Sequence, residues 1–265
     1  MSNPSPCSEL NSQNPLAGTA PTFDSWLILF HQGAWGERPV DTLVSDDLKK
    51  WAHERGAQIL LARTPKHVDP YPVSTFWISS GNGELLQGNL NSGGLPDLQH
   101  SQVSKPLLLI CTNGKRDRCC ATFGRGLISQ CKDLLSPASF EQILECSHID
   151  GHRFAPTAIW LPENLVLGRL DLNAVANLLT TGEIDSRFVR GSTQLSAAQQ
   201  VVQVNMWPQQ LEFLSCERLG ADFHITVLIN GVTESFTVTT TDTNVVASCG
   251  AEPKVSTLHH ITAGN

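Results

Sequence analysis

Short apolar runs alternate with turn residues along the first hundred residues of the chain. Trp26–Phe30 is an apolar run of strand length, and Ser45–Gly56 opens with a serine suited to cap a helix and closes with a glycine. Three more runs of strand length, bounded by prolines and by a Gly-Asn-Gly turn, cover residues 57–62, 74–78 and 84–88. The pattern therefore predicts the order β-α-β-β-β.

A similar pattern follows between residues 106 and 181. An apolar run at 106–110 predicts a buried strand, and 121–135 has helical periodicity. Further strands are predicted at 143–146, 158–161 and 165–168, and Asp171 can cap a helix that runs to Thr181. The order β-α-β-β-β-α resembles that of the first half and predicts a duplicated βαβ-type architecture. The segment 89–104 has little periodicity, and we interpret it as a linker between the halves.

The last third of the chain is predicted to form a helix and a β-hairpin. Residues 195–207 have helical periodicity, and 223–241 alternate on both sides of Asn230-Gly231, a strong hairpin signal. A final strand is expected at 254–262. The predicted organisation is a flexible tail at 1–18, an N-terminal α/β lobe at 19–100, a second α/β lobe at 105–190, and a C-terminal helix with a β-hairpin packed on the lobes at 191–265.

Composition narrows the functional classes. Of the 265 residues, 40% are hydrophobic and 16% are charged, which is typical of a packed protein and not of a disordered chain. The net charge of −7 disfavours a nucleic-acid partner. Because no signal-peptide pattern and no long apolar run are visible, we expect no membrane span and a cytoplasmic location. Eight cysteines in that compartment indicate metal binding or redox chemistry rather than disulfides.

One loop carries three of the cysteines. It runs from Cys111 to the adjacent Cys119 and Cys120, between a predicted buried strand and a helix, where α/β folds place functional sites. Nearby cations and the N-terminus of a helix both favour a thiolate over a thiol. We therefore expect a lowered cysteine pKa in this loop, caused by the following helix and by Lys115, Arg116 and Arg118.

A second segment adds a cysteine and two histidines. It contains Cys146, His148 and His152, and the bend that Gly151 permits would let both imidazoles face one point. Cysteine and histidine together suit zinc or iron rather than calcium or magnesium. Spacing alone leaves zinc and iron open, and an inert set of buried thiols and ordinary histidines remains the alternative. Eight residues between two cysteines are more than a structural zinc site usually has.

At these two segments the chain resembles the sucrase/ferredoxin-like family, which includes thioredoxin-like 2Fe-2S ferredoxins. The family patterns run roughly C-x-H-G-x-R-D-x-x-C and H-x-G-G-H-x-F-A, and this chain has C-T-N-G-K-R-D-R-C-C and H-I-D-G-H-R-F-A. The resemblance extends to residues 16–21, to Arg190-Gly191 and to residues 248–251. Asn113 stands where the family has histidine, and Asp150 where it has glycine.

The resemblance implies a 2Fe-2S cluster held by two cysteines and two histidines in a thioredoxin-like lobe. The residues that map onto the four ligands are Cys111, Cys120, His148 and His152, with Cys119 and Cys146 as alternates. The residues expected around the ligands are Lys115, Arg116, Asp117, Asp150 and Arg153. A carboxylate at position 150 is expected to bond an imidazole or to disfavour a reduced cluster.

Three functions remain open at this point. The first is one-electron transfer or redox sensing by the 2Fe-2S cluster, with an unidentified redox protein as partner. The second is thiol–disulfide exchange, either by the vicinal Cys119 and Cys120 or by Cys111 and Cys120, and the third is a structural zinc module that binds a partner. Hydrolysis is discounted, because Glu141 and Glu145 have the spacing of an exposed helix face and no motif pairs two carboxylates.

Overall fold

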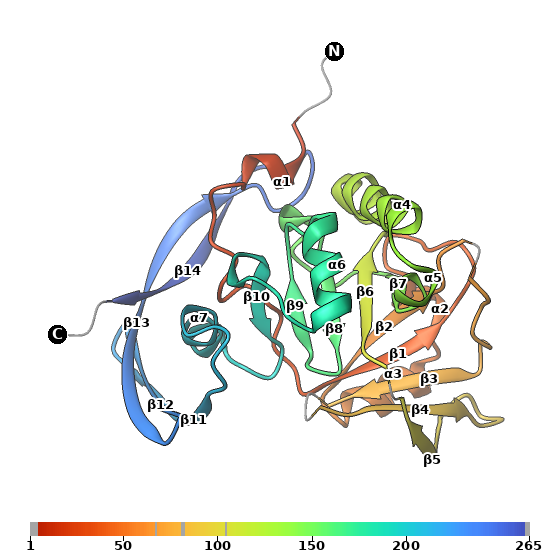
Figure 1. Cartoon of the computed structure of the whole chain (residues 1–265), viewed down its shortest axis with the longest axis horizontal. Helices are drawn as coiled ribbons and strands as arrows, with labels where there is room; N and C mark the ends of the chain where they lie inside the picture. Colours follow the sequence, from red (N-terminus) through yellow and green to blue (C-terminus); the bar gives the residue numbers. More distant parts are fainter. Residues whose placement is uncertain (1–4, 67, 81–82, 104, 263–265) are drawn as a thin grey trace.

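The protein is built around one large curled sheet with a second, smaller sheet beside it (Figure 1). The computed structural model describes residues 5–66, 68–80, 83–103 and 105–262. Ten strands form the large sheet in the order β10-β9-β8-β6-β7-β2-β1-β3-β4-β5, and four form an antiparallel sheet in the order β11-β12-β13-β14. The predicted mixed α/β class is therefore confirmed.

The first half of the large sheet follows the predicted order and adds one strand. Ser45 accepts a hydrogen bond from the backbone N–H of Leu48, which confirms the predicted helix cap. Part of the segment interpreted as a linker forms a further strand that pairs with its predecessor. The strands are β1 (Ser25–Phe30), β2 (Ala57–Arg63), β3 (Thr75–Ser79), β4 (Leu85–Leu90) and β5 (Pro96–Gln102), and the helices are α2 (Pro39–Leu43) and α3 (Asp46–His53).

The second half repeats the arrangement of the first. Its strands lie in the order β7-β6-β8-β9-β10, which matches β2-β1-β3-β4-β5, and each half begins with one parallel pair. Antiparallel pairing of β2 with β7 joins the halves. The elements are β6 (Leu107–Cys111), η1 (Cys120–Gly124), α4 (Arg125–Leu134), α5 (Pro137–Phe140), β7 (Ile143–Cys146), η2 (His152–Phe154), β8 (Ala158–Leu161), β9 (Leu165–Leu167), α6 (Leu172–Thr181), η3 (Ser186–Phe188) and β10 (Val189–Ser192).

The curl of the sheet creates a core shared by both halves. Alternate residues of β1 and β6, such as Ile28 and Leu109, lie in one buried cluster. The opposite faces carry separate clusters: Leu27 packs with α3, and Ile110 packs with α4 and α6. Because strand side chains alternate between faces, the odd-numbered Cys111 falls on the inner face, within the shared core.

The C-terminal region is larger than the predicted hairpin. The hairpin at Asn230-Gly231 is confirmed, and both residues have the positive φ of a type I′ turn, 51° and 83°. The final strand expected at 254–262 is confirmed, and a further strand at residues 212–219, which was not predicted, completes a four-stranded sheet. Val202 packs on its apolar face. The elements are α7 (Ala197–Asn205), β11 (Glu212–Leu219), β12 (Asp222–Ile229), β13 (Val232–Val245) and β14 (Lys254–Thr262).

The described part of the N-terminal segment is packed, in contrast to the flexible tail that we expected. It contains a short helix, α1 (Cys7–Leu10), in which Cys7 is fully buried. Arg169 donates hydrogen bonds of 2.7 and 2.6 Å to the backbone carbonyls of Asn11 and Asn14. The segment is held by residues far away in the chain, which local composition does not reveal.

The helix predicted at 121–135 begins with a π-helical turn, η1, before α4 continues. Gly124 ends this turn, and a Cβ added there would overlap the backbone carbonyl oxygen of Cys111. π-Helical turns are often found at functional sites, and this one brings the helix backbone against the end of β6.

We predict that Gly124→Ala destabilises the protein and that Gly126→Ala does not. The first change forces α4 away from β6, and overpacking of this kind costs about 1–3 kcal/mol. At Gly126 an added Cβ meets nothing within 4 Å, so the unfolding free energy should stay the same or rise by up to about 1 kcal/mol. Urea unfolding of both variants checks this, and equal stability of the two would contradict the close packing.

Candidate functional site

The candidate site lies where the parallel strands β6 and β7 end. Cys111 is the last residue of β6, and it pairs directly with Cys146, the last residue of β7. The loops that follow the two strands carry the other predicted site residues. Carboxyl ends of parallel strands are the usual place for sites in α/β sheets, so the local topology agrees with the predicted position.

A first group of metal-ligating side chains gathers at this edge. Ligand atoms of Cys111, Cys120 and His148 all lie within 4.8 Å of one another. Both cysteines are 1% exposed, and they lie in the shared core. The sulfur of Cys111 also lies 2.8 Å from the carbonyl oxygen of Ser147. Three of the four predicted ligands are thus brought together within one buried space.

The fourth predicted ligand, His152, lies beside this group. Its ring centroid is 5.2 Å from that of His148, and its Nε2 lies 2.7 Å from the hydroxyl of Ser248. Its buried Nδ1 has no hydrogen-bond partner among the described residues. Nε2 of His148 lies 2.9 Å from a carboxylate oxygen of Asp150, yet neither His148 ring nitrogen has a well-aligned hydrogen bond there. Buried imidazole nitrogens without partners are what a ligand set without its metal would present.

Neighbouring site residues, rather than the loop cations, control the cysteine pKa values. A hydrogen bond from Cys120 lowers the pKa of Cys111 to about 5, with burial opposing and His148 assisting. The close carbonyl of Ser147 opposes this thiolate, because two negative atoms repel. The same bond with Cys111 raises the pKa of Cys120. Our expectation that Lys115, Arg116, Arg118 and the helix N-terminus lower the pKa is therefore corrected.

The two histidines are shifted in opposite directions. Burial pulls the pKa of His148 down, but contact with Asp150 and Cys111 outweighs it and raises the pKa to about 9. Burial lowers the pKa of His152 to about 4, and the Asp117 carboxylate opposes this only in part. His152 is therefore a neutral imidazole at physiological pH, which is the form that binds a metal.

The other residues expected around the ligands have distinct places. Lys115 is exposed, and Arg116 pairs with Glu37 of the first half at 3.2 Å. The guanidinium of Arg153 stacks over Phe154 at 4.5 Å. Asp117 is buried, and its carboxylate accepts hydrogen bonds from backbone N–H groups and lies 3.5 Å from Nε2 of His152. Only Asp117 and Asp150 thus reach a predicted ligand through their side chains.

A second group of potential ligands, which the sequence did not predict as a set, lies next to the first. It consists of Cys7, Asp117, Cys119 and Cys249, whose ligand atoms lie within 4.8 Å of one another. The vicinal Cys119 and Cys120 therefore belong to different groups. Cys249 is half-buried. The only sequence signal for it was the family resemblance around residues 248–251, and Cys7 had none.

The second group holds more thiols than can ionise together. A hydrogen bond from Cys7 lowers the pKa of Cys119 to about 6. The same bond raises the pKa of Cys7, and burial raises that of Cys249. A single thiolate is therefore favoured within this group, because each further negative charge is repelled by Cys119 and Asp117.

Arg190, for which the sequence indicated no role beyond the family resemblance, positions the histidine loop. It is 1% exposed, and it donates a hydrogen bond of 2.9 Å to the carbonyl of Asp150 and two more to Thr19. Asp150 and Gly151 both have positive φ, 58° and 74°, so the chain bends sharply between His148 and His152. A side chain at position 151 would overlap the guanidinium of Arg190.

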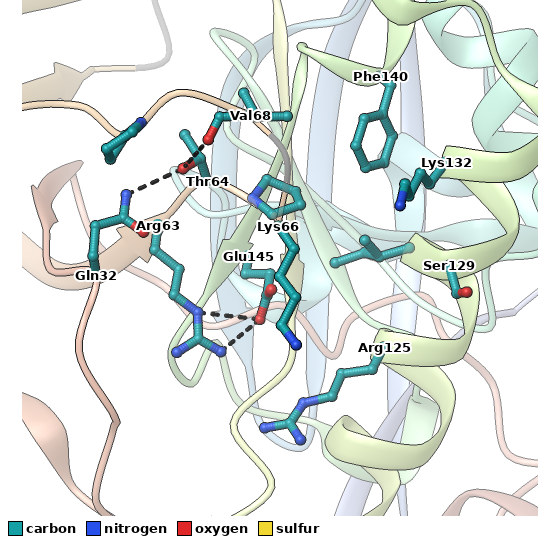
Figure 2. Close-up of a pocket in the computed structure, with 13 residues that line it drawn as sticks. Gln32, Arg63, Thr64, Lys66, Val68, Arg125, Ser129, Lys132, Phe140 and Glu145 are labelled. Carbon is teal, nitrogen blue, oxygen red and sulfur yellow. Dashed lines mark hydrogen bonds and ion pairs between the residues drawn. The ribbon is translucent and has the colours of Figure 1, made fainter.

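A pocket of about 730 Å³ opens to solvent beside β7 and α4 (Figure 2). Glu145 lies in it, and its carboxylate accepts hydrogen bonds from Arg63 at 2.7 Å and from the hydroxyl of Thr112 at 2.6 Å. The pocket therefore adjoins the residue that follows Cys111. The cations in its lining, which outnumber this one carboxylate, are Arg63, Lys66, Arg125 and Lys132.

The fold and these two groups of side chains define a mixed α/β protein with residues that could hold a metal ion. A family model described as sucrase/ferredoxin-like matches residues 16–191, and the chain belongs to that family. No curated protein and no solved structure matches the chain. Within the described residues, none of the helices has the length and apolar character needed to cross a membrane.

We predict that Arg190→Met destabilises the protein, with Arg187→Met as the matched control. The first change removes the three hydrogen bonds that the buried Arg190 donates to Thr19 and to the carbonyl of Asp150, at a cost of about 2–4 kcal/mol. Arg187 is exposed and pairs loosely with Asp185 at 3.7 Å, so its replacement should change stability by less than about 0.5 kcal/mol. Chemical denaturation measures both. Similar unfolding free energies for the two variants would rule out the positioning role.

Proposed function

We propose that the protein is a 2Fe-2S iron-sulfur protein for one-electron transfer or redox sensing, with Cys111, Cys120, His148 and His152 as ligands. The observation that carries the proposal is the first Cys/His group, with two thiols and one imidazole within 4.8 Å. The adjacent second imidazole has a buried nitrogen without a partner among the described residues. Two thiolates and two imidazoles are a donor set known for such clusters, so the residues fit the group.

The chain would shape the redox behaviour through charge and burial. When bound, a cluster of this kind accepts and donates one electron. Two thiolates and two neutral imidazoles carry less negative charge than four thiolates, so they favour the reduced form more. Ile149 and Phe154, which are 2% and 0% exposed, lie between or next to the histidines and help exclude water. The carboxylate of Asp150 instead disfavours the reduced form, because reduction adds negative charge close to it.

His152 supplies a place for a proton. With Nδ1 as ligand, Nε2 carries the proton, and the hydroxyl of Ser248 accepts its hydrogen bond at 2.7 Å. The Asp117 carboxylate lies 3.5 Å from the same nitrogen and favours the protonated form. Gain of an electron would strengthen proton binding at Nε2, which couples the two transfers.

The arrangement of the second half supports a thioredoxin-like lobe as part of this proposal. Strands β6 and β7 are parallel, β8 is antiparallel to β6, β9 is antiparallel to β8, and α6 follows. This gives the order second-first-third-fourth with the third strand reversed, which is the arrangement of a thioredoxin core. The ligands would lie at the end of its first strand, at the start of the helical segment that follows, and in the loop after its second strand.

A thiol–disulfide redox function is the second candidate. It is favoured by the lowered pKa of Cys111, about 5, beside the thiol of Cys120. The version that uses the vicinal pair is not favoured, because Cys119 lies with Cys7 and Cys249 instead. The third candidate, a zinc module at the first Cys/His group, has the same donor set and is distinguished by metal content.

We propose a redox protein with an acidic surface as partner, in the cytoplasm. Four cations line the pocket beside Thr112, on a chain whose net charge is −7, and such a local patch attracts acidic surfaces. None of the eight cysteines forms a disulfide, which agrees with a reducing compartment.

The first test is the metal content and visible spectrum of protein purified without oxygen. We expect a coloured protein with two irons and two sulfides per chain, and loss of both colour and iron in Cys111→Ser and in His152→Ala, because each removes a ligand. Cys216→Ser, at an exposed position in β11, is the control and should keep both. Colourless wild-type protein with stoichiometric zinc at these residues would overturn the proposal.

The second test is the pH dependence of the midpoint potential. Because the reduced form binds the Nε2 proton more tightly, the potential should fall as pH rises, by up to about 60 mV per pH unit in a window between about pH 6 and 9. Ser248→Ala removes the acceptor of that proton, so the window should move to lower pH. A potential that stays flat across this range in the wild type would argue against imidazole ligation.

A further inference from the structure

The second group of ligands joins three segments that are far apart in the chain. Cys7 lies in α1, Cys119 precedes η1, and Cys249 follows β13. The sulfur of Cys119 lies 3.5 Å from that of Cys7 and 3.2 Å from that of Cys249, and the remaining pair is 3.6 Å apart. Three sulfurs thus form a compact triangle, although more than 100 residues separate each pair of neighbours in sequence.

The carboxylate of Asp117 completes the group. Its Oδ1 lies 3.2 Å from the sulfur of Cys249 and 3.8 Å from that of Cys7. Backbone N–H groups of Cys119 and Cys249 donate to its two oxygens at 2.8 and 2.9 Å, which fixes the orientation of the carboxylate. Four potential ligand atoms therefore lie together: three sulfurs, which are soft ligands, and one carboxylate oxygen, which is a hard ligand.

These separations suit a tetrahedral zinc ion. With zinc–sulfur bonds of about 2.3 Å and a zinc–oxygen bond of about 2.1 Å, tetrahedral ligands lie about 3.8 Å apart for sulfur–sulfur pairs and about 3.6 Å for sulfur–oxygen pairs. The observed distances of 3.2 to 3.8 Å are close to these edges. Calcium and magnesium would require mostly oxygen ligands, and cuprous copper would not use the carboxylate.

The surroundings match those of a metal-bound thiolate group. The backbone N–H of Cys7 points to the sulfur of Cys249 at 3.5 Å, and the hydroxyl of Ser8 donates to the sulfur of Cys119 at 3.4 Å. Hydrogen bonds of this kind orient thiolate ligands and disperse their charge. The cationic Arg153 is half-buried nearby, and its buried Nε has no partner among the described residues.

We propose that Cys7, Cys119, Cys249 and Asp117 bind a structural zinc ion at a site distinct from the first Cys/His group. The ion would tie α1 and the segment after β13 to the lobe that carries the predicted cluster. A helix of four residues has little stability of its own, so an external tie explains why α1 is ordered. Asp117 would also connect the two sites, because its second oxygen faces His152 at 3.5 Å.

The test is separate measurement of zinc and iron in anaerobically purified full-length protein and variants. Wild-type protein should hold one zinc per chain, and Cys7→Ser and Cys249→Ser should reduce zinc about tenfold or more while leaving iron unchanged. Cys111→Ser should retain zinc. Cys216→Ser, at an exposed site, should change neither metal. Absence of iron from every sample would defeat the proposed function alone and leave the zinc site standing.

Three outcomes would overturn the zinc site. The first is wild-type protein that contains no zinc after growth in zinc-supplemented medium. The second is loss of zinc from Cys111→Ser together with its retention in Cys249→Ser. The third is a disulfide between any two of Cys7, Cys119 and Cys249 in freshly isolated protein, detected by thiol labelling and mass spectrometry.

If the cysteine variants do not fold, two measurements on the wild-type protein still test the zinc site. Cobalt exchanged for zinc should give the intense ligand-field absorption of a tetrahedral thiolate site, and weak octahedral absorption would exclude it. Removal of zinc by a chelator should speed amide hydrogen exchange in α1 and around Cys249, while α6 serves as an internal reference. Unchanged exchange in α1 would show that no ion ties it down.

Discussion

The parallel pairing of β6 with β7 is the constraint on which the rest of the site depends. It places Cys111 opposite Cys146 and sends both following loops to the same edge of the sheet. The curl of the sheet then covers this edge, so Cys111 and Cys120 lie in the shared core with 1% exposure. Gly124 permits the close approach of helix to strand that brings Cys120 back to Cys111. The thiols of Cys111 and Cys120 therefore lie in a protected position rather than on an open surface.

The two halves share a topology but carry different side chains at equivalent positions. Strand β1 occupies the place that β6 has in the second half, and it ends at Phe30, which packs against Tyr71 and Trp77, where β6 ends at a cysteine. The first half thus buries aromatic side chains where the second half offers ligands. Its loops also support the cysteine loop, since Asn113 donates to the carbonyl of Gly36 at 3.1 Å.

Asp117 links the local electrostatics of the two ligand groups. The buried carboxylate accepts hydrogen bonds from the backbone N–H groups of Cys119 and Cys249. Burial raises the pKa of Asp117, but these hydrogen bonds outweigh it and lower the pKa. It also faces Nε2 of His152. One residue therefore has contacts with both groups, and a change in charge at either one would be felt at the other through a few ångströms of low-dielectric protein.

The sequence by itself determined most of the elements and the local chemistry, but not the strand at 96–102 or the short helix at Cys7–Leu10. Strand and helix positions followed from periodicity and caps, as Ser45 and Asp171 show, and the loop containing Cys111 and Cys120 was visible because its residues are close in the chain. Tertiary structure alone decided that Cys119 and Cys120 belong to different ligand groups. It also brought Cys7 and Cys249 into contact across 242 residues and placed Arg190 against the bend between the histidines. The physical reason is range: periodicity and capping act within a few residues, whereas these contacts arise from the curl of the sheet and the packing of both ends of the chain on one lobe.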